Sequence, residues 1–227
     1  MAGVSEGIHR LSHEYIQDWI RAGLDINQSD NSGYTLLVRA VDAQDLHLTK
    51  LILSYGADPE AGSVPSDRGR PIRVAAELGN ADIVECLCRH GASPRRIEEC
   101  PNLMRDLLEH REFGVIRVLL KAGLGPNIDI IHWSFEEKLL VAVTRFGHGD
   151  SVHQLLNLNA DVNGLTENGR TGIFVAVENQ NERLVQKYIN FGANVHHQDN
   201  DGVTLLSHAL RNKHTRIIQK LIDAGID

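Results

Sequence analysis

The sequence is poor in the features that mark secreted, membrane-spanning and nucleic-acid-binding proteins. It has only three cysteines in 227 residues, and an odd number cannot all pair within the chain. No apolar run approaches the ~20 residues that a membrane-spanning helix needs. Lysine and arginine are outnumbered by aspartate and glutamate, 23 to 30, whereas nucleic-acid binding favours an excess of positive charge. We therefore expect an intracellular protein, cytoplasmic or nuclear, that binds neither nucleic acid nor membranes.

Motifs for metals, cofactors and catalysis are also missing. A single residue separates Cys86 from Cys88 in a predicted helix, and the second cysteine pair of a structural zinc site is missing. The 12 histidines do not combine with cysteine or carboxylate in a recognised metal-ligand spacing. The sequence shows no glycine-rich phosphate loop, nucleophile motif or cofactor fingerprint. We expect no metal and no cofactor.

What the sequence does contain is a helix stop that recurs along its length. Glycine is favoured just after a helix because that position commonly needs a positive φ. Such stops occur at glycines 23, 56, 91, 123, 192 and 225, and Asn159 takes the place of glycine in one more. Their successive separations are 33, 35, 32, 36, 33 and 33 residues. A period of about 33 residues, built from a turn and two helices, is the signature of one family of repeats.

The most regular unit runs from residue 164 to residue 194. It opens with a turn at Glu167-Asn168-Gly169-Arg170, and the hydroxyl of Thr171 is predicted to cap the helix that follows. Apolar residues then recur at helical spacing in two segments that a polar break at 179–181 separates. Neither helix can bury its apolar face alone, so each unit must pack against its neighbours.

On these residues the chain resembles an ankyrin-repeat protein. The family pattern Gly-x-Thr-Pro-Leu-His-x-Ala-Ala is matched best by Gly69-Arg70-Pro71-Ile72-Arg73-Val74-Ala75-Ala76. The resemblance implies an all-α ankyrin-repeat solenoid of helix-turn-helix units, with hairpin fingers and a concave groove. We expect one domain over residues 1–227, with repeats ending near residues 25, 58, 93, 125, 161, 194 and 227 and with the first and last repeats acting as caps.

The chain departs from the family pattern at several points. The fourth repeat lacks the turn glycine, Asn102 replaces its capping threonine, and an unusually apolar connection at 125–135 follows it. The histidine of Thr-Pro-Leu-His, which bridges neighbouring repeats in the family, is replaced throughout, so polar bonding between repeats must be weaker or different. Polar residues of the last helix, such as Arg216 and Gln219, are those expected of a terminal cap.

Family members usually bind proteins along the fingers and the exposed ends of the first helices. In this sequence those positions hold ten acidic residues and five arginines, which gives this face -5 of the formal charge of -7. We therefore expect a noncatalytic scaffold that binds a protein or peptide, with a basic segment favoured and the arginines pairing its acidic groups. Alternatively, these charges only keep the protein soluble. The candidate binding residues are Tyr34, Arg68, Arg70, Glu77, Glu109, His110, His132, Trp133, Phe135, Arg145, Phe146, Arg170 and Glu178.

Exposed aromatic residues are the sharpest candidates for anchors. Tyr34, Phe135 and Phe146 are expected at the surface, beside Trp133, and aromatic residues near arginine are enriched in binding hot spots. Alternatively, the long connection packs Trp133 and Phe135 over the irregular fourth repeat. We expect a monomer.

The sequence leaves one alternative function open and suggests one modification. A small-molecule or enzymatic site in the central groove would use His110, His132, Glu109 and Glu137 as acid and base, because neutral imidazole beside a carboxylate can exchange protons near neutral pH. Otherwise no catalytic residues are predicted. The family resemblance also implies asparaginyl hydroxylation at Asn27 or Asn163.

Overall fold

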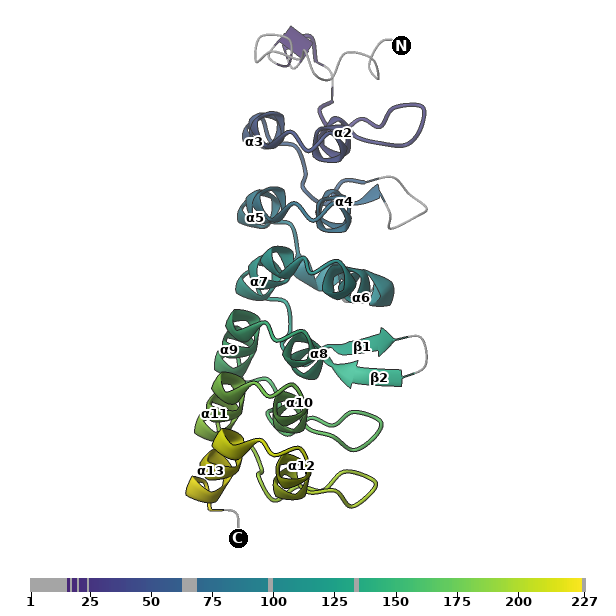
Figure 1. Ribbon diagram of the computed structural model, residues 1–227. Coiled ribbons are helices and arrows are strands. Elements are labelled where there is room, and N and C mark those ends of the chain that lie inside the picture. Colours follow the sequence, from purple (N-terminus) through teal and green to yellow (C-terminus); the bar gives the residue numbers. More distant parts are fainter. Residues whose placement is uncertain are drawn as a thin grey trace. The chain divides into compact units, whose positions relative to one another are not determined.

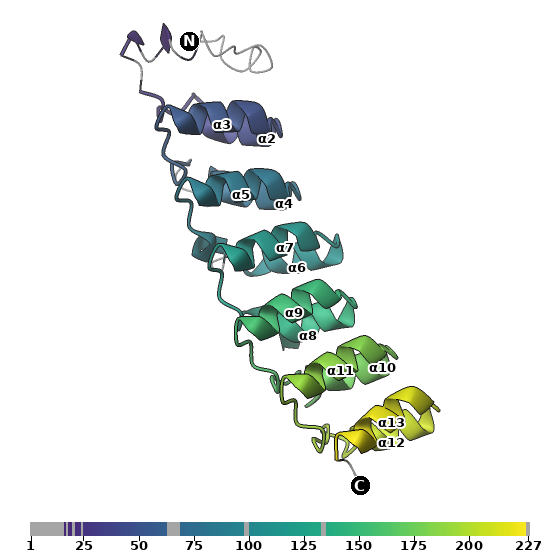
Figure 2. The same ribbon diagram turned by 90° about the vertical axis from the view of Figure 1, so that its left-hand side faces the viewer.

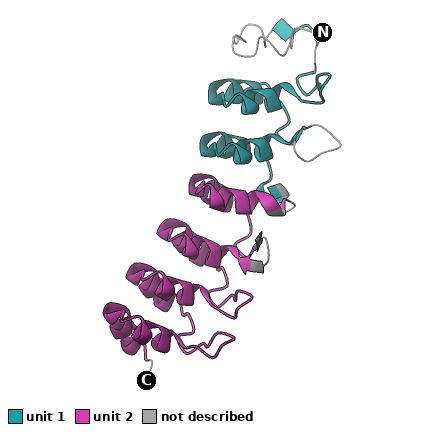
Figure 3. Ribbon diagram, turned by 45° about the vertical axis from the view of Figure 1, so that its right-hand side comes forward, with its two compact units in different colours: residues 1–99, 121–123 teal, residues 100–120, 124–227 magenta. Residues whose placement is uncertain are grey.

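The computed structural model describes residues 16, 18–19, 21–23, 25–62, 69–97, 100–132 and 135–225, and at residues 96, 101, 131, 132, 135 and 136 it describes the backbone alone. These residues are mainly helical, and each short helix is followed by a second one that lies beside it (Figure 1). The chain forms two compact units, residues 1–99 with 121–123 and residues 100–120 with 124–227, which we call unit 1 and unit 2 (Figure 3). The predicted all-α fold of helix-turn-helix units is confirmed.

The described part of unit 1 contains two helical hairpins. The first pairs α2 (Leu36–Asp42) with α3 (Leu46–Ser54), and the second pairs α4 (Pro71–Glu77) with α5 (Ala81–Arg89). Helix α2 packs on α4 and α3 packs on α5, so the hairpins stack face to face. Pro71 is the first residue of α4. A backbone N–H at that position has no acceptor within the helix, so proline loses no hydrogen bond there. A short 3₁₀ helix, η3 (Pro94–Ile97), follows the second hairpin.

Unit 2 continues the same pattern over its described residues. Its helical hairpins are α6 (Pro101–Glu109) with α7 (Phe113–Lys121), α8 (Leu139–Arg145) with α9 (Gly149–Asn157), α10 (Gly172–Glu178) with α11 (Glu182–Asn190), and α12 (Leu205–Arg211) with α13 (Thr215–Asp223). Helices α8, α10 and α12 form one row of contacts and α9, α11 and α13 a second (Figure 2). The core lies between successive hairpins.

The backbone angles confirm the predicted helix ends. Gly192 ends its hairpin with φ 79°, and Asn159 adopts φ 61° at the equivalent place, so asparagine does substitute for glycine there. The fingers are tight turns closed by isolated bridges such as Ser29 to Thr35 and Gln198 to Thr204. In each turn an aspartate, Asp30 or Asp199, accepts two backbone N–H bonds and holds the loop.

Two predicted helix caps differ from the structure. Helix α6 begins at Pro101 with Cys100 as N-cap, so the prediction that Asn102 caps it is wrong, because proline at the first position starts the helix earlier. Thr171 does occupy the N-cap of α10, but its hydroxyl makes no capping bond. The equivalent hydroxyls of Thr35 and Thr204 do accept a backbone N–H.

The apolar connection after α7 forms a small hairpin of two strands. Strands β1 (Asp129–His132) and β2 (Phe135–Lys138) pair antiparallel, with Asp129 opposite Lys138, and these two side chains form an ion pair at 2.6 Å. Ile130 is fully buried, and α6 packs against β1. This finger is therefore held by a strand ladder and by apolar contact, which explains why its sequence is less polar than a loop.

Polar bonds between neighbouring hairpins replace the histidine bridge of the family pattern. The side-chain oxygens of Asn27, Asn127 and Asn163 each accept the N–H that begins the next loop, at 2.8 Å, from Asp58, Asp161 and Asn194. The prediction that polar bonding between repeats is weaker or different from that of the family stays a prediction. Hydroxylation of Asn27 or Asn163 stays a prediction.

His148 caps helix α9 with its ring. Its Nδ1 accepts the N–H of Ser151 at 3.3 Å and lies 2.9 Å from the Ser151 hydroxyl, while the ring stacks on Phe113 at 4.1 Å. Burial lowers the pKa of His148, with Arg117 acting the same way and Asp150 opposing it. A lowered pKa means that the folded protein favours the neutral ring, which is the form that can cap.

We expect His148→Asn to flatten the pH dependence of stability. The contribution of a histidine with a lowered folded pKa is present above about 6.5, its unfolded value, and is lost as the pH falls through the folded pKa. Asparagine at the equivalent caps Asn80 and Asn181 makes the same bond without titrating. Urea unfolding from pH 5 to pH 8 measures this, and an unchanged pH profile in His148→Asn would contradict it.

Candidate functional site

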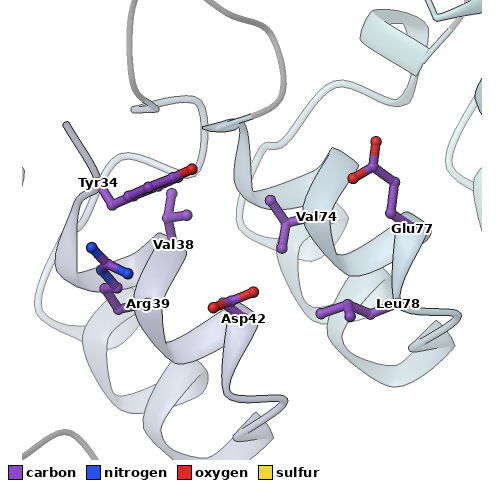
Figure 4. Close-up of a pocket in the computed structure, with 7 residues that line it drawn as sticks. All are labelled: Tyr34, Val38, Arg39, Asp42, Val74, Glu77 and Leu78. Atoms are coloured by element: carbon purple, nitrogen blue, oxygen red, sulfur yellow. The ribbon is translucent and has the colours of Figure 1, made fainter. Parts of the chain in front are cut away.

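A cleft in unit 1 lies between α2 and α4 and below the first described finger (Figure 4). Three kinds of group line it: aliphatic side chains, one tyrosine ring and three charged groups. The lining residues are Tyr34, Val38, Arg39, Asp42, Val74, Glu77 and Leu78. An apolar lining with a few charged groups is the composition of a binding site.

Helical spacing brings these side chains to one side of the two helices. Val38 and Asp42 lie one turn apart on α2, and Val74 and Leu78 lie one turn apart at the end of α4. Because α2 packs on α4, the two rows face a common space. Leu78 is 38% exposed, although it is a large aliphatic residue, so its side chain is available to a ligand.

Tyr34 is fixed in place at the mouth of the cleft by Arg39. The guanidinium of Arg39 lies over the Tyr34 ring, 4.6 Å from its centroid, and donates to Asp30 at 2.7 and 3.0 Å. Burial of Asp30 acts to raise its pKa, but hydrogen bonds from Arg39 and the N–H groups of Tyr34 and Ser32 outweigh this and hold the pKa below its usual value. The positive charge of Arg39 is thus already neutralised within the chain.

The negative charges of the cleft are less fully neutralised. Asp42 is exposed, and in the described part of the chain it has no ion pair. Glu77 pairs with Arg73 at 2.9 Å but keeps 43% of its side chain exposed. Since Arg39 is matched by Asp30 and Arg73 by Glu77, Asp42 leaves the cleft with a net negative charge. The cleft therefore favours a cation.

The predicted arginines are bound to acidic groups of the chain itself. Arg70 pairs with Glu60 at 3.1 Å, and Arg145 pairs with Glu137 at 2.9 Å. Arg170 joins Glu178 and Asp199. These arginines therefore stabilise the fold of each unit before any partner arrives. Arg68 lies outside the described residues.

The other predicted residues are divided between the surface and the core. Phe146 is half-buried and meets Phe113 edge-on at 6.1 Å, so it belongs to an aromatic cluster with His148. His110 is exposed, with Nδ1 2.8 Å from the carbonyl of Asp106, and Glu109 lies 3.7 Å from Arg105. Trp133 lies outside the described residues, and the side chains of His132 and Phe135 are not described either.

The proposed acid and base residues are not gathered at the cleft. Glu137, which the enzymatic alternative places in an open groove, is 1% exposed and bound to Arg145. A carboxylate held this way inside the protein is poorly placed to exchange protons with a ligand. Among the described residues, no group of three or more histidine, cysteine, aspartate or glutamate side chains is arranged to hold a metal ion.

Sequence reasoning found two members of the lining, Tyr34 and Glu77, as binding residues. It did not single out the other five, of which Val38 is buried and Arg39 and Val74 are half-buried. Arg39 and Val74 occupy equivalent positions in their repeats, each following the N-cap by four residues. That equivalence is a signal in the sequence that could have identified them, because α2 packs on α4.

Stacked helical hairpins with short turn-closed fingers define a helical-repeat protein. Residues 139–227 match the family model "Ankyrin repeats (3 copies)". Two crystal structures superpose with a TM-score of 0.64 and 18% identity: the human ASB11 ankyrin repeat domain, over 100% of this chain and 99% of that one, and the ankyrin repeat domain of Bcl-3, over 93% and 91%. The chain therefore has the fold of an ankyrin-repeat domain, and its residues 139–227 match the repeats of that family.

Curated relatives match over shorter stretches. The ankyrin repeat and KH domain-containing protein mask-1 of Caenorhabditis elegans is 27% identical over 111 residues, which are 48% of this chain and 4% of that protein. An ankyrin repeat protein of fowlpox virus is 26% identical over 117 residues, 51% of this chain and 16% of that protein. The chain thus spans less than a fifth of the length of these relatives.

Ankyrin repeats generally mediate interactions between proteins. Within the described residues, no helix has both the length and the apolar character needed to span a bilayer. The residues that would contact a partner must be argued from the geometry of the cleft.

Proposed function

We propose that this chain is a noncatalytic interaction scaffold that binds a basic segment of a partner protein, with one lysine or arginine side chain seated in the cleft between α2 and α4. The observation that carries the proposal is the lining itself. Val38, Val74 and Leu78 supply an apolar floor, and the carboxylates of Asp42 and Glu77 stand at its edge. A long aliphatic stem with a terminal cation satisfies both features, as such side chains do elsewhere.

The surrounding residues support the same kind of partner. Tyr34 adds a rigid aromatic wall held by Arg39, and anchoring residues of this type dominate binding energies. In unit 2, Phe146 with Phe113 and His148 is the corresponding aromatic contact that we propose, and Phe135 and Trp133 remain candidate binding residues. A single domain, a monomeric state and a cytoplasmic or nuclear setting belong to this proposal. The four residues of the enzymatic alternative do not line the cleft.

Selection of random peptides on the immobilised wild-type protein at low salt provides the test. We expect the selected peptides to share a lysine or arginine beside an apolar residue, and their affinity to fall as salt is raised. Tyr34→Ala and Asp42→Asn should each lower the affinity for the tightest-binding peptide about tenfold, which corresponds to ~1.4 kcal/mol. Fluorescence anisotropy of the labelled peptide measures the change.

The matched control is Asp82→Asn, which removes an exposed carboxylate from α5, outside the cleft. It should leave the affinity unchanged. Peptides without a basic residue, or binding that survives both Tyr34→Ala and Asp42→Asn, would disprove the proposed site.

A further inference from the structure

The outer helices α11 and α13 of unit 2 carry four cations at matching positions. Arg183 and Lys187 lie one turn apart on α11, and Arg216 and Lys220 lie one turn apart on α13. A separation of 33 residues relates the two pairs, and α13 packs on α11, so the cations form two adjacent rows (Figure 2). We call these four residues the basic patch.

The two lysines of the basic patch are held in place by neutral groups. The ammonium of Lys187 donates to the backbone carbonyl of Gly149 at 3.0 Å, and that of Lys220 donates to the side-chain oxygen of Gln186 at 3.0 Å. Each bond fixes a lysine across two neighbouring outer helices, because Gly149 belongs to α9 and Gln186 to α11. The two positive charges are therefore positioned by the fold without being neutralised by these bonds.

The two arginines of the basic patch are available to a ligand. Arg183 is exposed and makes no ion pair within the described residues. Arg216 lies 3.6 Å from Glu182, but 82% of its side chain is exposed, and such surface pairs contribute little. The four cations face two carboxylates on the same helices, Glu182 and Asp223, so α11 and α13 together carry a formal charge of +2 in a chain of charge -7.

The exposure of the basic patch is the same with and without a following hairpin. Arg183 is exposed and Lys187 is half-buried although α13 packs on their helix, and Arg216 and Lys220 have the same two degrees of exposure. A further hairpin stacked on α13 would therefore leave this row of side chains in solvent. The basic patch is a lateral surface of the stacked hairpins of unit 2.

We propose that the basic patch binds an acidic segment of a partner protein, with glutamate or aspartate carboxylates on Arg183 and Arg216 and with the two lysines adding positive potential. A guanidinium presents a planar pair of N–H donors that matches a carboxylate. Cations one turn apart on a helix are separated by about 6 Å, and packed helices by about 8–10 Å, so successive carboxylates of one segment can meet both rows. This surface is independent of the unit 1 cleft, which favours a cation.

Binding of a labelled oligoglutamate peptide to the full chain at low salt, followed by fluorescence anisotropy, tests the proposal. The negative charge of the whole chain opposes this binding, so it requires a local positive surface. We expect Arg183→Gln combined with Arg216→Gln to lower the affinity about tenfold, or ~1.4 kcal/mol. The melting temperature should stay unchanged, because both arginines are exposed. Amide chemical shifts that the peptide changes should lie on α11 and α13.

The matched control is Lys50→Gln combined with Arg89→Gln, which removes two exposed cations from the outer helices α3 and α5 of unit 1. It changes the net charge by the same amount and should leave the affinity unchanged. An equal loss of affinity in this control, or no binding of oligoglutamate by the wild-type chain, would overturn the proposal. Single-stranded RNA that displaces the peptide and binds more tightly would also overturn it, by assigning the patch to nucleic acid.

Discussion

Gly172→Ala is expected to lower the free energy of unfolding by about 2–3 kcal/mol, although alanine normally stabilises a helix relative to glycine. Gly172 is the first residue of α10, and a Cβ there would lie 2.1 Å from the hydroxyl oxygen of Tyr188 and 2.5 Å from its Cζ. Tyr188 is fully buried, so its ring cannot swing aside into solvent. Urea unfolding monitored by circular dichroism measures the loss.

The tyrosine is held from its other side as well. Its hydroxyl lies 2.6 Å from Oγ1 of Thr144, which donates in turn to the carbonyl of Leu140 at 2.7 Å. Burial raises the pKa of Tyr188 far above its usual value, so the phenol remains a neutral donor. Moving the ring to admit a methyl group would break this buried hydrogen bond, and an unsatisfied buried group costs about 1–3 kcal/mol.

Gly149→Ala is the matched control, because Gly149 is the first residue of α9 and a Cβ there meets only Leu184 Cδ2 at an ordinary 3.8 Å. We expect it to be neutral or slightly stabilising. Tyr188→Leu removes the phenol ring, so in that background Gly172→Ala should lower the free energy of unfolding little further. If Gly172→Ala and Gly149→Ala behaved alike, the proposed clash would be refuted.

Local rules explain why so much of the fold was predictable. The stops at Gly192 and Asn159 depend on a backbone angle that few residues adopt, and Pro71 at the start of α4 depends on a single missing N–H. Such signals act over a few residues and recur once per repeat, so they fix the register of the hairpins. Where Pro101 replaced the usual turn and cap, the same local reasoning placed the start of α6 too late.

Contacts between repeats were much less predictable. The hydroxyl of Tyr188 in α11 lies 2.6 Å from Oγ1 of Thr144 in the preceding hairpin, and nothing in the sequence near Thr144 indicates that partner. The Asn163 side chain likewise bonds to the N–H of Asn194, 31 residues away. A repeat pattern shows that neighbouring hairpins stack, but the shape and donors at each interface depend on pairs of positions that no single repeat contains.

Two of the residues that line the cleft were predicted from the sequence, but the charge state of the predicted arginines was not. Tyr34 and Glu77 were found because the family pattern carries their positions over, and both line the cleft. The arginines were expected to await a partner, yet Arg70 and Arg145 are occupied by Glu60 and Glu137. A formal charge count cannot separate paired from unpaired groups, so it overstates the charge that a partner would meet.

Arg170→Met is expected to lower the free energy of unfolding by about 2 kcal/mol, because it leaves a buried carboxylate without its cation. Arg170 Nε lies 3.1 Å from Asp199, whose side chain is only 1% exposed, and its guanidinium lies over Phe174, 5.0 Å from the ring centroid. Arg170 thus ties one finger to the next. Arg183→Met, which removes an exposed arginine from α11, should change the stability by less than about 0.5 kcal/mol.

Arg170→Met should also make the protein more sensitive to acid. Burial acts to raise the pKa of Asp199, but hydrogen bonds from the N–H groups of Val203 and Asp201 and from Arg170 outweigh it and lower the pKa below 3.8. Because the folded pKa is lowered, the stability that Asp199 contributes is present above 3.8, the unfolded value, and is lost as the pH falls through the folded pKa. Without Arg170 the folded pKa should rise, so this loss should begin at a higher pH. Titration of the Asp199 carboxyl carbon by NMR measures the shift, and an unchanged pKa in Arg170→Met would mean that the backbone N–H groups alone hold the charge.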